Sequence, residues 1–356
     1  MKFALPNQER FSIILHHATP ILIAQLASIS TSAVDTLIAA RSGTTDLAAV
    51  GVGNGLFITV MLACAGVTQG LTPIAAHHFG AKRFDELRPC FQQGIWLCLA
   101  LSIGGIAILS FPGWILALNH VTPAVAQRTR DYLAVIAWSL PGMLIYRCCG
   151  GMFNALGRPR MLMILGLCYA AGHALLAPTL AFGWLGTPAL GAVGCAASML
   201  FNMVILAALA LGYLARSDWG HKFDLFKNWT RPCAARLKEL LKLGLPIGMS
   251  SFVEMSSFAL IGLLVASLGA EQVGANRVAG SLTGICYMLP LAISIATLSQ
   301  IGQAAGAQDQ TRVRQTISAG LILGGGAAIC LGLCLWLFAR PVVALFSPES
   351  RVQLLA

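Results

Sequence analysis

The 356-residue chain contains very little charge: 10% of its residues are Asp, Glu, Lys or Arg, whereas 57% are hydrophobic. Soluble domains carry charge on about a quarter of their residues, so this composition excludes an ordinary soluble fold. Acidic residues are the scarcest, with 13 Asp and Glu against 23 Lys and Arg, a net charge of +10. The basic residues are spread along the chain without a patch of interleaved aromatics, which argues against a nucleic-acid partner.

Motifs of metal and cofactor chemistry are also missing from the sequence. None of the 11 cysteines forms a Cys-x-x-Cys pair. The glycine-rich stretch 51–55 lacks the spacing of a nucleotide-binding fingerprint. The sequence shows no clustered Ser/His/Asp residues and no paired catalytic acids. We therefore expect no enzyme and no resident cofactor.

Long apolar segments are what the chain has in abundance. Crossing a hydrocarbon core takes about 20 apolar residues, and nine stretches meet that length: 14–40, 52–76, 92–118, 132–154, 160–185, 189–214, 243–268, 279–305 and 317–346. This pattern predicts an all-α polytopic membrane protein.

An internal repeat divides these segments into two groups. Residues 18–94 align with 244–320 at a constant offset of 226, which pairs Pro20 with Pro246, Gly43 with Gly269, Gly80 with Gly306, Arg88 with Arg314 and Gly94 with Gly320. The copies begin an even number of crossings apart, so they run parallel. The repeat predicts two parallel helical bundles, six helices in the first and an incomplete three in the second.

The domain boundaries and the orientation follow from the basic residues. We predict an N-lobe over 1–215, a cytoplasmic linker over 216–242 and a partial C-lobe over 243–356. The N-terminus, the linker and the other loops on the same side carry sixteen Lys and Arg, whereas the opposite side carries six. Because cytoplasmic loops retain positive charge, we expect a cytoplasmic N-terminus, with the first segment retained as an anchor. The remaining basic residue, Arg147, lies inside the fourth segment.

Asp35 and Glu254 are the two acids that lie well inside apolar segments. An ionised carboxylate at the bilayer centre costs about 2.5 to 3.5 kcal/mol, so such groups usually face a bundle interior and often mark ion pathways. The two are not repeat equivalents, because Asp35 follows Pro20 by fifteen residues and Glu254 follows Pro246 by eight. We therefore predict two staggered, non-identical negative sites, one in each lobe.

Several stretches resemble the multidrug and toxic compound extrusion (MATE) family of transporters, in its bacterial NorM-type branch. The first-helix stretch 34–40 with 46–50 and the seventh-helix stretch 245–254 are similar to family signatures. The turn 154–160 and the helix start 189–195 also match, and the resemblance covers essentially the whole chain.

The resemblance implies a secondary active multidrug exporter in the bacterial inner membrane. Family members are V-shaped pairs of six-helix bundles that exchange cationic, amphipathic drugs for sodium ions or protons. Asp35 and Glu254 occupy the family's acidic positions, so the resemblance implies that both are cation-coupling residues, and a sodium ion at Glu254 is the one metal that it implies. We expect a monomer whose partners are small cationic drugs and the lipid bilayer.

The sequence departs from the family pattern in three places. The second copy is shorter than the first, so we expect a chain truncated after the ninth helix. His173 stands where the family usually has Asn, and Arg277 stands where related sequences have Gln. Together with Asn202, these two are candidate polar residues of the transport cavity. His173 is a candidate proton-sensitive group, although a single His in an apolar segment is more often structural.

Two other functions remain open from the sequence. A lipid-linked saccharide flippase of a related fold would more naturally have a basic cavity to accept phosphate, and the acids Asp35 and Glu254 argue against it. An inactive transporter fragment is the other alternative.

Overall fold

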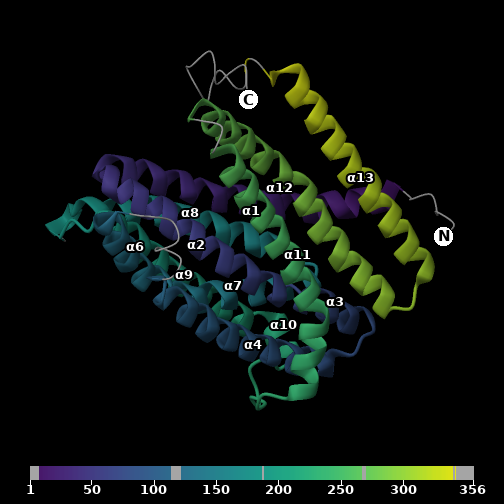
Figure 1. The fold of residues 1–356 in the computed structure, drawn as a ribbon. Helices are drawn as coiled ribbons and strands as arrows, with labels where there is room; N and C mark the ends of the chain where they lie inside the picture. Colours follow the sequence, from purple (N-terminus) through teal and green to yellow (C-terminus); the bar gives the residue numbers. More distant parts are fainter. Residues whose placement is uncertain (1–7, 114–121, 187, 267–269, 340, 342–356) are drawn as a thin grey trace.

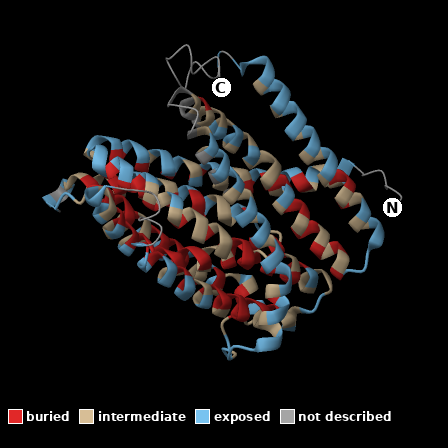
Figure 2. Cartoon of the chain, in the orientation of Figure 1, coloured by how far each residue is buried: buried red, intermediate tan, exposed pale blue. Residues whose placement is uncertain are grey.

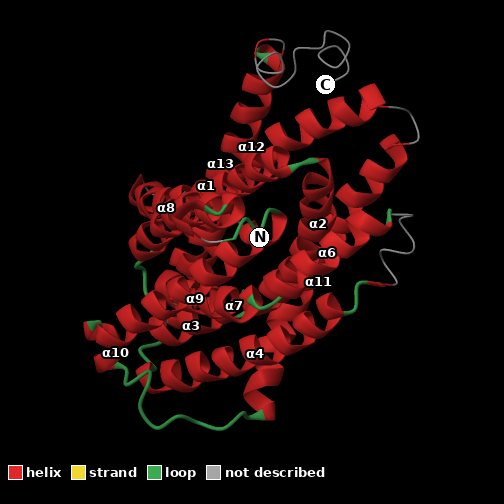
Figure 3. Ribbon diagram, turned by 90° about the vertical axis from the view of Figure 1, so that its left-hand side faces the viewer, coloured by secondary structure: helices red, strands yellow, loops and turns green. Residues whose placement is uncertain are grey.

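The computed structural model describes residues 8–113, 122–186, 188–266, 270–339 and 341, and the regular structure in these ranges is helical, without strands (Figure 3). The prediction of an all-α protein is confirmed. Helices of the first half form one bundle, and the last three long helices cross one side of it (Figure 1).

The elements of the first half are listed here in chain order: α1 (Gln8–Ser42), α2 (Thr44–Thr68), α3 (Leu71–Gly80), α4 (Phe84–Ser110), α6 (Pro123–Ile136), α7 (Ser139–Ala155), α8 (Arg160–Phe182), a 3-10 turn (Trp184–Gly186) and α9 (Ala192–Arg216). The short α10 (Asp218–Lys222) follows. The second half contains α11 (Ala234–Ala266), α12 (Ala270–Gly306) and α13 (Gln310–Leu337).

Eight helical spans in the described ranges are long and apolar enough to cross a membrane, with α2 and α3 counted as one span, and the number rises to nine if α6 and α7 form a bent ninth span. These two helices meet at an angle of 44°. With that bent span included, the nine predicted crossings are all accounted for. The protein is therefore a multi-pass membrane protein.

The two halves differ in how much of their surface is covered. The main core lies among α2, α3, α4, α6, α7 and α9, and its largest enclosed side chains include Tyr132, Phe57 and Phe91. Buried residues are concentrated there, whereas α13 is mostly exposed and buries only Thr316, Ser318 and Ala319, near its first residues (Figure 2). A bundle of apolar helices with apolar outer faces is what a lipid environment requires.

The halves meet through reciprocal contacts between repeat-equivalent helices. Helix α1 packs on α12, and α2 packs on α11. Gly302 lies against Ala76, its own counterpart at the offset of 226. A Cβ at Gly80 would collide with the carbonyl oxygen of Gln303, and a Cβ at Gly306 would collide with that of His77, the counterpart of Gln303. The contact therefore has approximate two-fold symmetry, and small residues allow the backbones to approach.

We call the end of the molecule where α3 and α12 meet the closed end. It is also tied by two hydrogen bonds from α12 to the last residues of α7. The Ser299 hydroxyl donates to the carbonyl of Asn154 at 2.5 Å, and the Gln303 amide donates to that of Ala155 at 2.8 Å. These bonds hold the second half against the first.

The segment between α10 and α11 is bound to helix α4. The Gln92 amide donates to the carbonyls of Leu225 and Lys227 and accepts from the backbone N–H of Thr230, at 2.9 to 3.1 Å. Gln93 makes a similar pair of bonds to Arg231 and Cys233. Helix α11 already begins at Ala234, inside the range predicted as linker. The linker is therefore an ordered segment attached to the first half, and the domain boundaries stay predictions.

Candidate functional site

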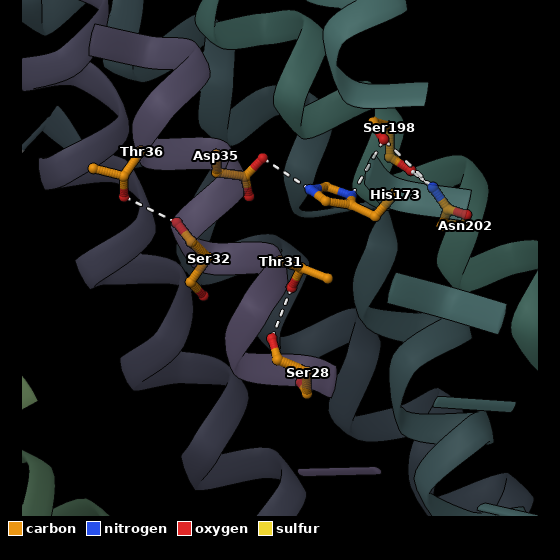
Figure 4. Close-up of polar contacts among 8 residues, drawn as sticks. All are labelled: Ser28, Thr31, Ser32, Asp35, Thr36, His173, Ser198 and Asn202. Atoms are coloured by element: carbon orange, nitrogen blue, oxygen red, sulfur yellow. Dashed lines mark hydrogen bonds and ion pairs between the residues drawn. The ribbon is translucent and has the colours of Figure 1, made fainter. Parts of the chain in front are cut away.

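Asp35 lies on the buried face of α1, and its carboxylate points toward α8 (Figure 4). The residue is 8% exposed. Its Oδ1 is 2.9 Å from Nε2 of His173, which is completely buried. When the carboxylate is ionised it only accepts hydrogen bonds, so in that state Nε2 of His173 is the donor. The structure thus brings together the first predicted coupling acid and the residue that departs from the family pattern.

The hydrogen bonds continue from His173 into α9. Nδ1 of His173 is 3.2 Å from the Ser198 hydroxyl. The Asn202 amide donates to that hydroxyl at 3.4 Å and to the Ser198 carbonyl at 2.9 Å. The order is consistent in direction: Asn202 donates to Ser198, Ser198 to a neutral His173, and His173 to Asp35 (Figure 4). We call these four residues the N-lobe polar chain.

Helix packing sets the geometry of the N-lobe polar chain. Helix α8 packs between α1 and α9, so one side chain of α8 can reach both neighbours. Gly172 makes room for the N-lobe polar chain, because a Cβ there would lie 2.5 Å from Oδ1 of Asn202. The ring of Tyr169, one turn before His173, lies 5.9 Å from the imidazole.

Chemically, the N-lobe polar chain can accept or release a proton without exposing a charge to lipid. A proton on His173 gives an imidazolium beside a carboxylate, and its removal leaves the neutral imidazole with the same partners. The order Ser198, His173, Asp35 resembles that of a hydrolytic triad, but Ser198 is completely buried. Its hydroxyl is out of reach of a substrate in this structure.

Glu254 lies in α11 and is only partly buried. The Tyr287 hydroxyl of α12 lies beside its carboxylate. Glu254 is not part of the N-lobe polar chain, so the two predicted acids occupy separate sites. In the described ranges no group of three His, Cys, Asp or Glu residues could hold a metal ion. The sodium ion at Glu254 therefore stays a prediction.

The other two candidate cavity residues have different outcomes. Asn202 is 8% exposed and takes part in the N-lobe polar chain. Arg277 belongs to helix α12, but its side chain lies outside the described residues.

A cavity of about 130 Å³ lies between the first half and α12. Helices α1, α7 and α8 contribute much of its wall, and Ile295 and Leu298 of α12 complete it. Neither Asp35 nor Glu254 is among the lining residues; Arg147 is the one charged side chain there. Ser28, which aligns with Glu254 at the offset of 226, does line the cavity.

A second buried carboxylate, which the sequence did not single out, lies at the opposite end from the closed end. Asp46 of α2 is 7% exposed and binds Nε of Arg128 of α6 at 3.1 Å. Its Oδ2 accepts the N–H of Ala192 at the start of α9, at 3.0 Å. Gly191 permits this approach: its φ is +58°, and a Cβ there would collide with the carboxylate. The Asp46 carboxylate therefore joins α2 to α6 and to α9.

Ser198 and Arg147 are the site residues that the sequence did not predict. The signal for Ser198 was its spacing of four from Asn202, which places both on one helix face. The signal for Arg147 was its isolation in an apolar segment.

Comparison with known proteins shows which family this arrangement belongs to. The MatE family model matches residues 20–179 and 246–356. The chain belongs to the MatE family of transporters. A probable multidrug resistance protein NorM of Aromatoleum aromaticum is 47% identical to this MatE protein over 343 residues, covering 96% of the chain and 74% of the relative. The multidrug resistance protein NorM of Aliivibrio fischeri is 29% identical, covering 98% and 76%. The predicted family is confirmed.

Solved structures agree on the fold. A crystal structure of MATE in complex with MaL6 superimposes on the MatE chain with a TM-score of 0.87 at 19% identity, covering 97% of the chain and 76% of that structure. An outward-facing multidrug resistance MATE family transporter gives 0.85 at 20% identity, covering 97% and 76%. The prediction of a transporter fold built from helical bundles is confirmed.

Proposed function

We propose that this MatE protein exports cationic, amphipathic compounds in exchange for a coupling cation, with Asp35 and Glu254 as the coupling acids. The observation that carries the proposal is the buried pair of Asp35 and His173. Charged groups inside membrane proteins are costly to bury and mark ion and proton pathways. Relatives named as multidrug resistance proteins support the direction and the class of substrate.

The geometry at Asp35 favours a proton as its coupling cation. Hard metal cations are held by several oxygen ligands, whereas the nearest partner of Asp35 is an N–H donor. That donor occupies the position that a sodium ion would take at Oδ1. At Glu254 the neighbouring group is the Tyr287 hydroxyl, which suits a proton or a sodium ion. Transfer of one charge through 100 mV supplies about 2.3 kcal/mol, enough for roughly fiftyfold accumulation.

The proposal includes a place and an orientation. We place the protein in the bacterial inner membrane with the N-terminus in the cytoplasm, as the basic residues predict. The closed end would then face the cytoplasm, because α3 and α12 meet there and the basic linker lies on the same side. Opening would separate the reciprocal glycine contacts between the halves.

One observation favours a second candidate, the lipid-linked saccharide flippase. The cavity between the halves carries an arginine and no acid among its lining residues. A volume of about 130 Å³ could hold a phosphate group, but small-molecule sites that enclose a whole drug-sized ligand have about 300 Å³ or more. We therefore retain export of small compounds as the better supported function.

Ethidium transport by the purified chain in liposomes tests the proposal. We expect a pH gradient to drive ethidium movement and an ionophore that collapses this gradient to stop it. Asp35→Asn should lower the rate to that of protein-free liposomes. Asp85→Asn is the matched control, because Asp85 is an exposed acid at the start of α4.

Ethidium transport that Asp35→Asn leaves intact would overturn the role of Asp35. Transport driven by a sodium gradient alone would overturn the choice of a proton at that site. If neither gradient moves ethidium with the unmutated chain, the inactive-fragment alternative is favoured.

A further inference from the structure

Arg147 lies inside the membrane-spanning part of α7, eight residues before its last residue, or about 12 Å along the helix axis. It lines the cavity between the halves. Four ion pairs occur among the described residues, and none of them includes Arg147. An intramembrane arginine normally pairs with a carboxylate or a backbone carbonyl. Arg147 therefore presents an uncompensated positive charge to the cavity.

A second polar group on the same face of α7 has no partner. Asn154 is 9% exposed and lines the same cavity. Its Oδ1 is buried without a hydrogen-bond partner, while its backbone carbonyl is held by Ser299. An amide oxygen only accepts hydrogen bonds, so this buried atom calls for a donor, such as water or an N–H or O–H group of a ligand. Seven residues separate Asn154 from Arg147, close to two helical turns, so both project to the same side.

The other polar residues of the cavity can also contact a ligand. Gln25 and Gln69 come from α1 and the junction of α2 and α3, and Tyr146 and Tyr169 come from α7 and α8. Amides and hydroxyls can each donate hydrogen bonds to an oxyanion. The wall is therefore basic and rich in donors, in contrast to the acidic sites at Asp35 and Glu254.

The size of the cavity limits what it holds. A volume of about 130 Å³ is too small for a whole drug-sized compound but sufficient for one charged end of it. The wall includes Ile295 and Leu298 of α12, so the cavity changes when the halves move apart. A group bound here would be sensitive to the transport cycle.

We propose that this cavity is a subsite for the oxyanion end of an amphipathic compound, with Arg147 as the primary contact. The inference rests on the proposed export function. It adds zwitterions to the expected substrates, and the cationic part of such a compound lies outside the subsite. The oxyanion is a carboxylate of a soluble compound or the phosphate of a lipid.

Two dyes that differ at one group provide the test. Rhodamine 110 carries a free carboxylate, and rhodamine 123 is its methyl ester. We would measure their equilibrium binding to the purified full chain in phosphatidylcholine nanodiscs, without an ion gradient. Because a hydrogen bond to a charged group contributes about tenfold or more in affinity, rhodamine 110 should bind about tenfold more tightly. Arg147→Gln should abolish that difference and leave rhodamine 123 unchanged.

Two variants control for folding and charge. Arg147→Lys retains the charge and should keep part of the preference for rhodamine 110. Arg83→Gln removes one positive charge from an exposed residue between α3 and α4, and it should alter neither dye. Equal affinity of the unmutated chain for both dyes would overturn the proposal, as would equal weakening of both by Arg147→Gln.

A lipid arm distinguishes the two sources of the oxyanion. If lipid phosphate occupies the subsite, nanodiscs containing phosphatidylglycerol should weaken rhodamine 110 binding to the unmutated chain but not to Arg147→Gln. No effect of phosphatidylglycerol assigns the subsite to soluble carboxylates. Because no gradient is used, failure of ethidium export would leave these binding results intact, and failure of the dye preference would leave export intact.

Discussion

The two lobes present their buried acids in opposite ways. Asp35 is enclosed, 8% exposed, and joined to three other polar residues. Glu254 is partly exposed and has the half-exposed Tyr287 as its neighbour. An enclosed acid exchanges its proton through hydrogen-bonded partners, whereas an accessible acid can bind a cation directly from solvent. A duplicated backbone therefore holds its two intramembrane acids in two different environments.

The repeat itself shows how this difference arose in the sequence. The counterpart of Glu254 is Ser28, and the counterpart of Asp35 is Ile261, which is 47% exposed. Each lobe thus has an acid where the other has an uncharged residue. The backbone contacts between the lobes are reciprocal, but the acids do not stand at equivalent positions. Substitutions can therefore test the acid of each lobe separately.

Beyond the loss expected for Asp35→Asn, the largest effect is expected at the accessible site. Glu254→Gln should reduce ethidium export in pump-deficient cells by about tenfold or more, since a coupling ion loses its charged ligand. Glu239→Gln is the control, because Glu239 is exposed in the same helix. Dye accumulation would be measured at matched membrane levels. Normal efflux by Glu254→Gln would show that the C-lobe acid has no coupling role.

The enclosed site should be the more important for stability. His173→Ala removes the buried hydrogen-bond partner of the Asp35 carboxylate and the contact of the Ser198 hydroxyl with Nδ1, at a cost of about 2 to 5 kcal/mol in unfolding free energy. Tyr287→Phe beside Glu254 should cost less than about 1 kcal/mol, because water can replace the hydroxyl. Thermal unfolding in detergent measures both, with His221→Ala as an exposed control. Equal melting temperatures for both variants would contradict the contrast between enclosed and accessible sites.

The reciprocal glycines predict equal effects in the two lobes. Gly80→Ala and Gly306→Ala each place a Cβ against a backbone carbonyl across the contact, which should cost about 1 to 3 kcal/mol. Gly104→Ala in α4 is the control, since nothing lies within 4 Å of its added Cβ. Thermal unfolding again provides the measurement. A large loss for one glycine and none for the other would refute the approximate two-fold contact.

The smallest effect concerns the linker, which belongs to neither site. Cys233 is exposed, and backbone N–H groups of Arg236 and Ala235 lower the pKa of its thiol. A lower pKa means more thiolate at a given pH. Labelling by a membrane-impermeant maleimide should therefore persist to lower pH than in the unfolded chain.

The sidedness of this labelling tests the predicted orientation. Inside-out vesicles should be labelled and intact cells should not, with Cys233→Ala as the blank. Labelling of intact cells would place the linker outside and reverse the predicted orientation.

Much of the fold could be predicted because a membrane restricts a chain to few solutions. Apolar length alone identified the crossings, and the repeat predicted two helical bundles. The bend between α6 and α7 was not among the predictions, although the sequence marks it: Pro141 has no N–H to donate to the carbonyl of Ala137, four residues earlier. The site was predicted in part: Asp35 and Glu254 stand out as acids in apolar segments, whereas Ser198 is an ordinary helix residue in the sequence.

By itself, the sequence determined the membrane environment, the repeat, the family and the two acids. Burying charge in lipid is costly, so charged residues are rare in apolar segments and the exceptions are easy to recognise. Only the tertiary structure decided which side chains meet. Asp35, His173 and Ser198 come from three helices whose rotation depends on packing, and the same packing turns Arg147, rather than either acid, into the cavity. Such contacts depend on the relative rotation of helices, and a hydropathy pattern does not specify that rotation.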